Sequence, residues 1–365
     1  MKLRCDRKEL QEIVAVVGGV TASRGTRPIL QHILFKTHGP ELELLATDLE
    51  VSLRCRYTPL LIEEQGTLAL PAGMISSILR EAPGETIDLS TDGNVALLRS
   101  ARGQFRVGGE NPADFPEVAV GDAPNFVDLP APLFRELAER TEFAASRELG
   151  RYAIDGILLE LDGKTIRMVS TDGRRLALAE ATLELPVAHP VKEIVPLKGV
   201  VHFLRALGPG AEVVGLHLSK RRALLRCGNT ILSATSRDAE FPDYRGVVPA
   251  EDVGTTVQLD RDNFFGCVRQ VNVMAGDDAP AITLTFSEGS LVLAGKHEGR
   301  GDARSEMPVD YIGPEVKISF NPAFLLDFGK KQLPEKLPFS FRDSTAACVF
   351  RPAAGFAYVV MPMSL

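Results

Sequence analysis

The sequence predicts an α+β protein built from three repeated, sheet-rich domains, each of which contains two helices. Similar sequence blocks recur along the chain, and each block contains two stretches with the apolar periodicity of a helix. Short segments rich in strand-forming residues, bounded by turn residues, fill the rest of each block. A chain of 365 residues is also too long for one ordinary hydrophobic core, which favours two or three domains.

The repeat is clearest between the first and second blocks. The segment ILQHILF starts at Ile29 and AIDGILL at Ala153, while ATD ends at Asp48 and STD at Asp172, with the same separation in both pairs. The third copy is fainter, because AITLTFSEGSLVLAGK keeps a strand–turn–strand pattern but lacks the Thr-Asp pair. Proline, glycine and acidic residues cluster between the blocks, so we expect domains over residues 1–122, 126–247 and 253–365.

Two amphipathic helices are predicted in each domain. The first helix should follow a strand end and a polar turn, at the segments CDRKEL, LPAPLF and LDRDNF. These first helices are expected within residues 11–20, 135–144 and 265–274, and the second helices near residues 72–82, 197–207 and 322–332.

Turn signals such as LDGKT, STDGN and FSEGS predict hairpins between the strands. The chain ends in YVVMPMSL, in which Tyr358, Val359 and Val360 favour a last strand that Pro362 should terminate. An apolar end of this kind is unusual, since chain ends are normally polar. It has two interpretations: a strand that belongs to the core, or a terminus that lines a binding surface with flexible methionines.

Composition excludes several classes of function. The net charge of −7 argues against an ordinary tight DNA binder but permits weak, local contact with DNA. The five cysteines form no CxxC pair and the six histidines share no ligand spacing, so we expect reduced thiols and neither a metal nor another cofactor. Because the chain begins with charged residues and contains no long apolar stretch, we expect a cytoplasmic protein without a membrane span.

No catalytic constellation is evident. The segment STDGRRLALAE reads most simply as a structural hairpin, and no second carboxylate, histidine or serine is spaced to make Asp172 a catalytic acid. Two alternatives remain open on the residues alone: an acidic cytosolic enzyme, and a repeat scaffold that binds peptides but not DNA.

Four segments carry a resemblance to a known family: RYAIDGILLE (151–160), STDGRRLA (170–177), EFPDYRGVVP (240–249) and the closing YVVMPM. On these the chain resembles the bacterial sliding clamp, the β subunit of DNA polymerase III, over its full length. The resemblance implies the DNA clamp fold, closed as a head-to-tail homodimer into a ring around duplex DNA. It implies a non-catalytic processivity subunit that tethers the replicative polymerase, the clamp loader and other proteins carrying a short glutamine/leucine/phenylalanine-type motif.

The resemblance also implies three sets of functional residues. A peptide-binding cleft between the second and third domains would comprise Arg151, Ile154, Thr171, Gly173, Arg174, Arg175, Leu176, Pro242, Val247, Val359, Val360, Met361, Pro362 and Met363. Basic residues facing DNA would be Arg24, Arg80, Lys198 and Arg205. The dimer contact would involve Ile78, Arg102 and Phe105 of one protomer and Val273, Glu298 and Asp302 of the other. Gly246, Ser364 and Arg174 depart from the residues common in the family, which leaves the peptide preference open.

Overall fold

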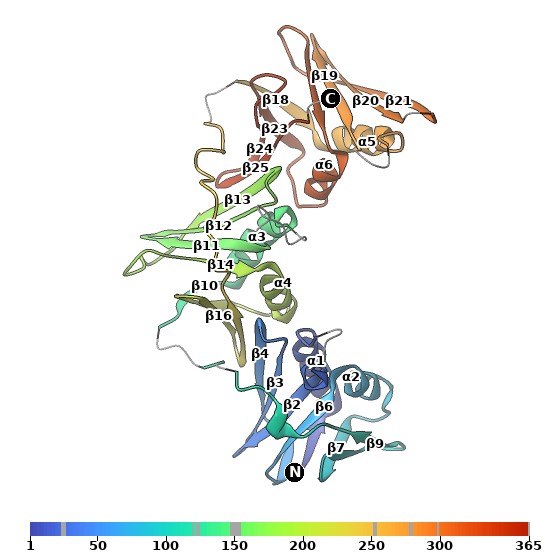
Figure 1. Ribbon diagram of the computed structural model, residues 1–365, viewed down its shortest axis with the longest axis vertical. Coiled ribbons are helices and arrows are strands. Elements are labelled where there is room, and N and C mark those ends of the chain that lie inside the picture. The colour runs from blue at the N-terminus through green and yellow to red at the C-terminus, as the bar shows by residue number, and fades with distance from the viewer. Residues whose placement is uncertain are drawn as a thin grey trace. The chain divides into compact units, whose positions relative to one another are not determined.

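The computed structural model describes residues 1–22, 27–118, 120–121, 125–146, 155–250, 254–276, 280–297 and 299–363 (Figure 1). Its chain divides into two compact units. The first unit contains Met1–Arg135 and Val195–Arg237, and the second contains Glu136–Ile194 and Asp238–Leu365.

The first unit contains two antiparallel sheets. A five-stranded sheet has the order β5-β1-β7-β8-β9, with β1 (Lys2–Asp6), β5 (Leu61–Glu64), β7 (Thr86–Asp92), β8 (Val95–Arg99) and β9 (Gln104–Gly108). An eight-stranded sheet has the order β10-β15-β16-β17-β4-β3-β2-β6, with β2 (His32–His38), β3 (Glu41–Thr47), β4 (Val51–Tyr57), β6 (Thr67–Pro71), β10 (Val127–Pro130), β15 (Val213–Ser219), β16 (Arg222–Cys227) and β17 (Thr230–Thr235).

Two further sheets contain the remaining strands. An eight-stranded sheet has the order β14-β11-β12-β13-β25-β24-β23-β18, with β11 (Gly156–Asp162), β12 (Thr165–Thr171), β13 (Arg175–Thr182), β14 (Val191–Pro196), β18 (Thr255–Asp260), β23 (Lys336–Phe341), β24 (Cys348–Ala353) and β25 (Phe356–Val360). A four-stranded sheet has the order β21-β20-β19-β22, with β19 (Ile282–Ser287), β20 (Ser290–His297), β21 (Gly301–Pro308) and β22 (Val316–Phe320).

The described residues contain the six predicted α-helices: α1 (Arg7–Gly18), α2 (Ala72–Glu81), α3 (Ala131–Thr141), α4 (Leu197–Ala206), α5 (Arg261–Asn272) and α6 (Pro322–Gly329). The first helix of each repeat begins earlier than expected. The predicted polar turn is absent at α1 and α5, because Asp6 and Asp260 are each both the last residue of a strand and the N-cap of the following helix. Their carboxylates accept hydrogen bonds from the backbone N–H groups of Glu9 (3.0 Å) and Asn263 (3.1 Å).

The repeat is reproduced in one turn that occurs twice. Asp48 accepts hydrogen bonds from two backbone N–H groups that follow it, and Asp172 does the same. The residue after the aspartate has a left-handed backbone in both copies: Gly173 has φ +86° and Leu49 has φ +79°. Glycine adopts this conformation freely, whereas leucine is strained by it. Leu49 is also 50% exposed.

Strand pairing joins neighbouring repeats. Strand β4 of the first repeat pairs with β17 of the second, with Leu53 opposite Leu232. Strand β13 of the second repeat pairs in the same way with β25 of the third, with Leu176 opposite Val359. The two compact units therefore differ from the three predicted domains, because each eight-stranded sheet runs across a repeat boundary.

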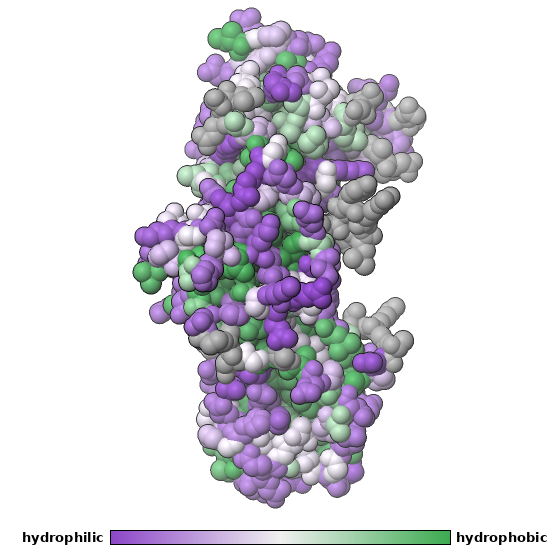
Figure 2. Space-filling view, turned by 60° about the vertical axis from the view of Figure 1, so that its left-hand side comes forward, coloured by the Kyte–Doolittle hydropathy of each residue, from purple (hydrophilic) through white to green (hydrophobic). Residues whose placement is uncertain are grey.

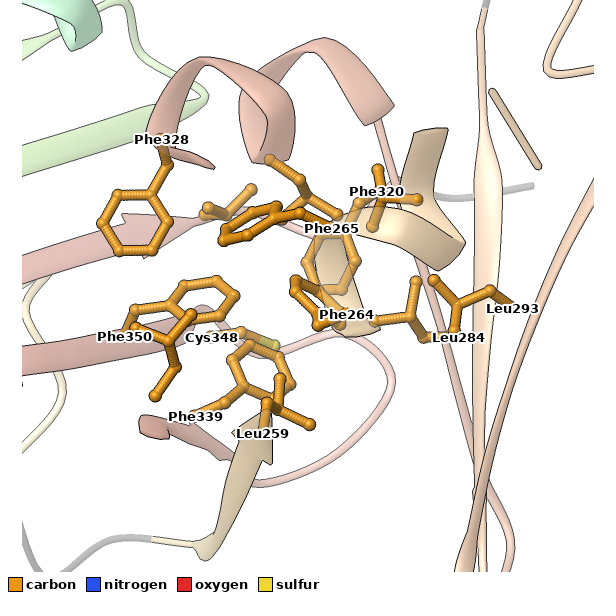
Figure 3. Packing of buried hydrophobic residues seen from close by; sticks show 14 of the residues in the cluster. Leu259, Phe264, Phe265, Leu284, Leu293, Phe320, Phe328, Phe339, Cys348 and Phe350 are labelled. Atoms are coloured by element: carbon orange, nitrogen blue, oxygen red, sulfur yellow. The ribbon is translucent and has the colours of Figure 1, made fainter. Parts of the chain in front are cut away.

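The core of the third repeat is aromatic. Phe264 and Phe265 of α5 pack with Phe328 of α6 and with Phe339 and Phe350 of the sheet, and Figure 3 shows Phe328 pointing toward Phe350. The Phe328 and Phe350 ring centroids are 5.0 Å apart, and those of Phe339 and Phe350 are 4.6 Å apart. Aromatic pairs at such distances stabilise a core beyond the area that they bury.

One face of the molecule is mainly polar. Figure 2 shows a face on which hydrophilic side chains predominate and hydrophobic ones occupy smaller areas. The hairpins predicted at LDGKT, STDGN and FSEGS are confirmed as β11–β12, β7–β8 and β19–β20. Among the described residues, helices lack the length and apolar character that a membrane crossing requires.

Candidate functional site

A pocket with a volume of about 290 Å³ lies on the second compact unit, where β13 and β25 run side by side. It is lined by the turn before β13, the start of β13, the segment 242–247 and the end of β25. The lining residues are Thr171, Gly173, Arg174, Arg175, Leu176, Pro242, Tyr244, Val247, Val359 and Met361.

The turn before β13 is rigidly hydrogen-bonded. The Asp172 carboxylate accepts from the N–H groups of Arg174 and Arg175, both at 3.0 Å. The Thr171 hydroxyl accepts from the Gly173 N–H at 3.0 Å and donates to the Arg175 carbonyl at 2.7 Å. An aspartate followed by a left-handed glycine suits this turn, because the aspartate carboxylate accepts hydrogen bonds from backbone N–H groups and glycine adopts the left-handed conformation without strain. One wall of the pocket is therefore fixed by its own sequence.

Arg175 joins this turn to the third repeat. Its guanidinium donates to Asp172 at 2.9 Å and to Asp327 of α6 at 3.0 Å, and it lies 4.6 Å from the centre of the Phe324 ring. Burial opposes ionisation of Asp327, but the hydrogen bonds from Lys330 and Arg175 outweigh it and lower the pKa of that carboxyl. Arg175 therefore supports the pocket wall, with its charge already compensated.

The pocket has a buried apolar floor and exposed apolar walls. Leu176 and Val359 are 4% and 1% exposed, so they form a preorganised floor. Val247 and Met361 remain 41% and 39% exposed in the free chain. The Met361 N–H donates to the Arg174 carbonyl at 2.9 Å, which holds the chain end against the turn. Apolar walls with few polar groups suit large apolar side chains of a ligand.

Tyr244 is a wall residue that sequence reasoning missed. Its hydroxyl donates to the buried Glu160 carboxylate at 2.5 Å, which also accepts from Arg167 (3.1 Å) and Arg245 (3.2 Å). Burial and the bond to Glu160 raise the pKa of Tyr244 to about 12. The only sequence signal was its place in FPDYRGV, between two residues expected in the cleft.

The structure brings together most of the residues expected in the cleft. Nine of them line the pocket: Thr171, Gly173, Arg174, Arg175, Leu176, Pro242, Val247, Val359 and Met361. Val360 does not, because successive strand residues face opposite sides and its fully buried side chain packs in the core of the third repeat. Pro362 and Met363 lie outside the lining, and the Met363 N–H donates to the Ser319 carbonyl at 2.8 Å. Arg151 and Ile154 fall outside the described residues.

The apolar residues at the chain end divide into two groups. Tyr358 and Val360 belong to the core, while Val359 and Met361 line the pocket. The strand ends at Val360, as Pro362 predicted. Both interpretations hold for different residues of the same segment.

Comparison with known proteins gives a consistent match along the whole chain. Family models of the DNA polymerase III beta subunit match in succession: its N-terminal domain at residues 1–119, its central domain at 128–243 and its C-terminal domain at 245–364. The beta sliding clamps of Pseudomonas putida and Escherichia coli are each 30% identical to this chain, and the alignments cover 100% of this chain and of each relative. The chain belongs to the beta sliding clamp family.

Solved structures agree with this assignment. The crystal structure of a sliding clamp from Pseudomonas aeruginosa bound to griselimycin matches with a TM-score of 0.93 at 30% identity, covering 100% of both chains. The DNA polymerase III beta subunit from Thermotoga maritima matches with a TM-score of 0.93 at 26% identity, covering 100% of this chain and 99% of that one. The predicted fold class, three sheet-rich clamp domains, is thereby confirmed.

In this member of the sliding clamp family, the expected DNA-facing cations differ in availability. Arg80 and Arg205 are exposed, and Arg80 pairs only with its neighbour Glu81 among the described residues. Lys198 is already engaged: its ammonium contacts Asp48 at 2.6 Å and also Glu50. Burial opposes the charge of Lys198, but these two carboxylates outweigh it and raise its pKa. Arg24 lies outside the described residues.

The residues expected in the dimer contact lie on or near two sheet edges. Phe105 is half-buried on β9, the last strand of its sheet, with Arg102 exposed just before it and Ile78 half-buried on α2. Asp302 is exposed on β21, the last strand of the four-stranded sheet, and Val273 is 75% exposed after α5. Glu298 lies outside the described residues.

The described residues hold no group of three or more His, Cys, Asp or Glu side chains arranged for a metal ion. All five cysteines are free thiols. Burial raises the pKa of Cys5 and of Cys348 to about 12, so both resist forming the reactive thiolate.

Proposed function

We propose that two copies of this chain close head to tail into a ring that encircles duplex DNA and tethers the replicative polymerase. The ring would also recruit the clamp loader and other DNA-processing proteins through a short glutamine/leucine/phenylalanine-type peptide. In this role the chain is a non-catalytic, cytoplasmic subunit of the polymerase holoenzyme, made of three clamp domains at residues 1–122, 126–247 and 253–365. Membership of the sliding clamp family supports the partnership with DNA and the polymerase and the closure as a dimer.

The observation that carries the proposal is the pocket over the paired strands β13 and β25. Its apolar floor is preformed, its exposed walls are Val247 and Met361, and its turn is held by hydrogen bonds that need no ligand. A leucine or phenylalanine side chain of a partner would bury these walls on binding. Apolar anchors in such pockets carry most of the energy of peptide recognition.

Ring closure is supported by two edge strands. Strand β9 carries the half-buried Phe105 with Arg106 beside it, and β21 carries the exposed acids Asp302 and Glu306, with Arg304 between them and paired with Glu306. An unpaired strand edge is a ready template for another strand. Because β9 and β21 belong to different repeats, pairing them between two chains would give a closed head-to-tail dimer.

Weak contact with DNA suits this function. A clamp must hold DNA by topology, since each neutralised phosphate adds salt-dependent affinity that would slow sliding. The acidic chain, with exposed Arg80 and Arg205 and an internally paired Lys198, fits such transient contact.

Retention on circular DNA tests the proposal. The protein is loaded onto nicked circles by a clamp loader, unbound protein is removed, and the circles are then cut once by a restriction enzyme. We expect protein to stay on uncut circles at moderate salt and to leave the DNA as soon as it is linearised. Equal release from circular and linear DNA would contradict topological tethering and favour a scaffold that binds only peptides.

A further inference from the structure

A second, larger cavity continues the pocket along the same face of the sheet. Its volume is about 700 Å³. On β13, Leu176 lines the smaller pocket and Leu178 the larger one; on β25, Val359 and Ala357 divide in the same way. Residues two apart on a strand point to the same face, so both cavities open on one side of this sheet. Tyr244 lines both and separates them.

The separating residue is held firmly in place. The Tyr244 hydroxyl donates to Glu160 at 2.5 Å, and the Arg245 guanidinium lies 4.9 Å from the centre of the tyrosine ring while donating to the same carboxylate at 3.2 Å. Several hydrogen-bond donors stabilise the charge of a buried carboxylate and fix the position of the groups that donate to it. Tyr244 is therefore a fixed ridge between the two cavities, over which an extended peptide could pass.

The larger cavity carries an excess of positive charge. Three arginines line it, and Arg167 is compensated by Glu180 (2.8 Å) and by Glu160 (3.1 Å). Arg245 keeps 63% of its side chain exposed while sharing Glu160. Arg351 is half-buried on β24 and donates to the Pro249 carbonyl, and within the described residues it forms no ion pair. The three guanidinium groups thus outnumber the two carboxylates, Glu160 and Glu180, and Arg351 pairs with neither.

The remaining lining is suited to a polypeptide. Leu178, Val248 and Ala357 offer apolar contact, and the hydroxyls of Thr256 and Ser340 lie 2.8 Å apart on the neighbouring strands. Nucleic acid fits less well, because a chain of phosphates calls for several cations, whereas only Arg351 and Arg245 of this lining are left without full compensation. A peptide with one or two carboxylates would instead meet the unpaired donors of Arg351 and Arg245.

We propose that this cavity, here called the arginine cavity, binds acidic side chains of the partner peptide a few residues away from its apolar anchors. The inference rests on the proposed peptide binding in the smaller pocket and adds a determinant of partner preference. An aspartate or glutamate accepts hydrogen bonds from Arg351 and Arg245 after the chain has passed Tyr244. Partners with an acidic flank bind more tightly than partners with a neutral one, and the difference falls as salt rises.

Fluorescence anisotropy with labelled peptides tests this inference. The core peptide carries only the glutamine/leucine/phenylalanine-type motif, and its longer versions carry Asp-Glu or Ser-Gln flanks on the N-terminal or the C-terminal side. We expect the acidic flank on one side to bind about 5- to 10-fold more tightly than the neutral flank at low salt. Arg351→Gln should remove this gain and leave the affinity for the core peptide unchanged, whereas Arg342→Gln, at an exposed arginine outside the cavity, should change neither.

A charge swap protects the test against indirect effects. In Arg351→Glu, a Lys-Lys flank on the same side should become the preferred ligand and an Asp-Glu flank should be disfavoured. A thermal melt of each variant shows that the dimer is folded.

The outcomes separate the two proposals. If the core peptide binds but neither acidic flank adds affinity, or if Arg351→Gln keeps the gain, the arginine cavity has no such role and the proposed function stands. If a short DNA duplex displaces the acidic flank but not the core peptide, the cavity binds phosphate and the peptide assignment is wrong. If the core peptide does not bind at all, both proposals fail.

Discussion

Met361→Ala should weaken peptide binding while leaving the fold intact. Met361 is 39% exposed in the free chain. Fully burying a methionine side chain contributes about 1.5–3 kcal/mol, so covering this exposed part contributes about 0.6–1.2 kcal/mol. The peptide anchor loses a similar contact, which brings the total to about 1.2–2.4 kcal/mol, or a roughly 7- to 50-fold loss of affinity at about 1.4 kcal/mol per decade.

The matched control is Met74→Ala, because Met74 is a comparably exposed methionine (52%) on α2, in the other compact unit. Anisotropy titration of the core peptide gives the affinity of each variant, and a thermal melt reports the fold. We expect the control to bind like the unaltered chain and both variants to melt as it does. A change below threefold for Met361→Ala, or an equal change for Met74→Ala, would refute the assignment of Met361 to the binding wall.

Three other predictions follow from residues described above. Phe105→Ala should raise the dimer dissociation constant by at least about 30-fold, since buried aromatic anchors often contribute about 2 kcal/mol or more. Sedimentation velocity over a dilution series gives the dissociation constants of the variant and of the unaltered chain, and equal constants would contradict the placement of Phe105 in the dimer contact. Gly173→Ala should lower the free energy of unfolding by about 1–2 kcal/mol, whereas Leu49→Gly should raise it by up to about 1 kcal/mol, because both positions need a left-handed backbone. Urea denaturation measures both changes. Destabilisation by Leu49→Gly would show that the leucine makes a contact that stabilises the fold by more than its backbone strain costs. Asp48→Asn should reduce stability mainly above pH 4, because burial opposes ionisation of Asp48 but the hydrogen bonds from Lys198 and the backbone outweigh burial and lower the pKa of that carboxyl. A carboxyl whose pKa is lowered on folding contributes stability that is present above its unfolded pKa and lost as the pH falls through its folded pKa. A stability difference between variant and unaltered chain that did not shrink between pH 5 and pH 2 would contradict the ion pair.

The sequence predicted local structure well, because local structure depends on neighbouring residues. Helical periodicity located all six helices, and the Asp-Gly and Glu-Gly pairs located the hairpins. The helix starts were misjudged where one aspartate both ends a strand and caps the next helix, as Asp6 and Asp260 do. A pattern that treats strand, turn and helix as successive segments cannot represent a residue that serves two of them.

Long-range pairing could not be predicted in the same way. The side of β25 that faces the pocket depends on its register with β13, and nothing near Val360 in the sequence specifies that register. The partners of Arg175 and Tyr244 are distant in sequence, at Asp327 and Glu160. The pocket could therefore be located by resemblance, while the ion pairs that hold it required the fold.

The strand pairing between repeats has a consequence for how this chain can be taken apart. A protein assembled from three similar copies invites dissection at the repeat boundaries, yet a cut there would sever the ladder between β13 and β25 or that between β4 and β17. Each fragment would then expose an unpaired strand edge with apolar residues along it, and such an edge promotes aggregation. The three repeats can be recognised separately in the sequence, but we expect that they cannot be expressed separately in soluble form. The central repeat contributes residues to both compact units, so a cut on either side of it would break one of the two ladders.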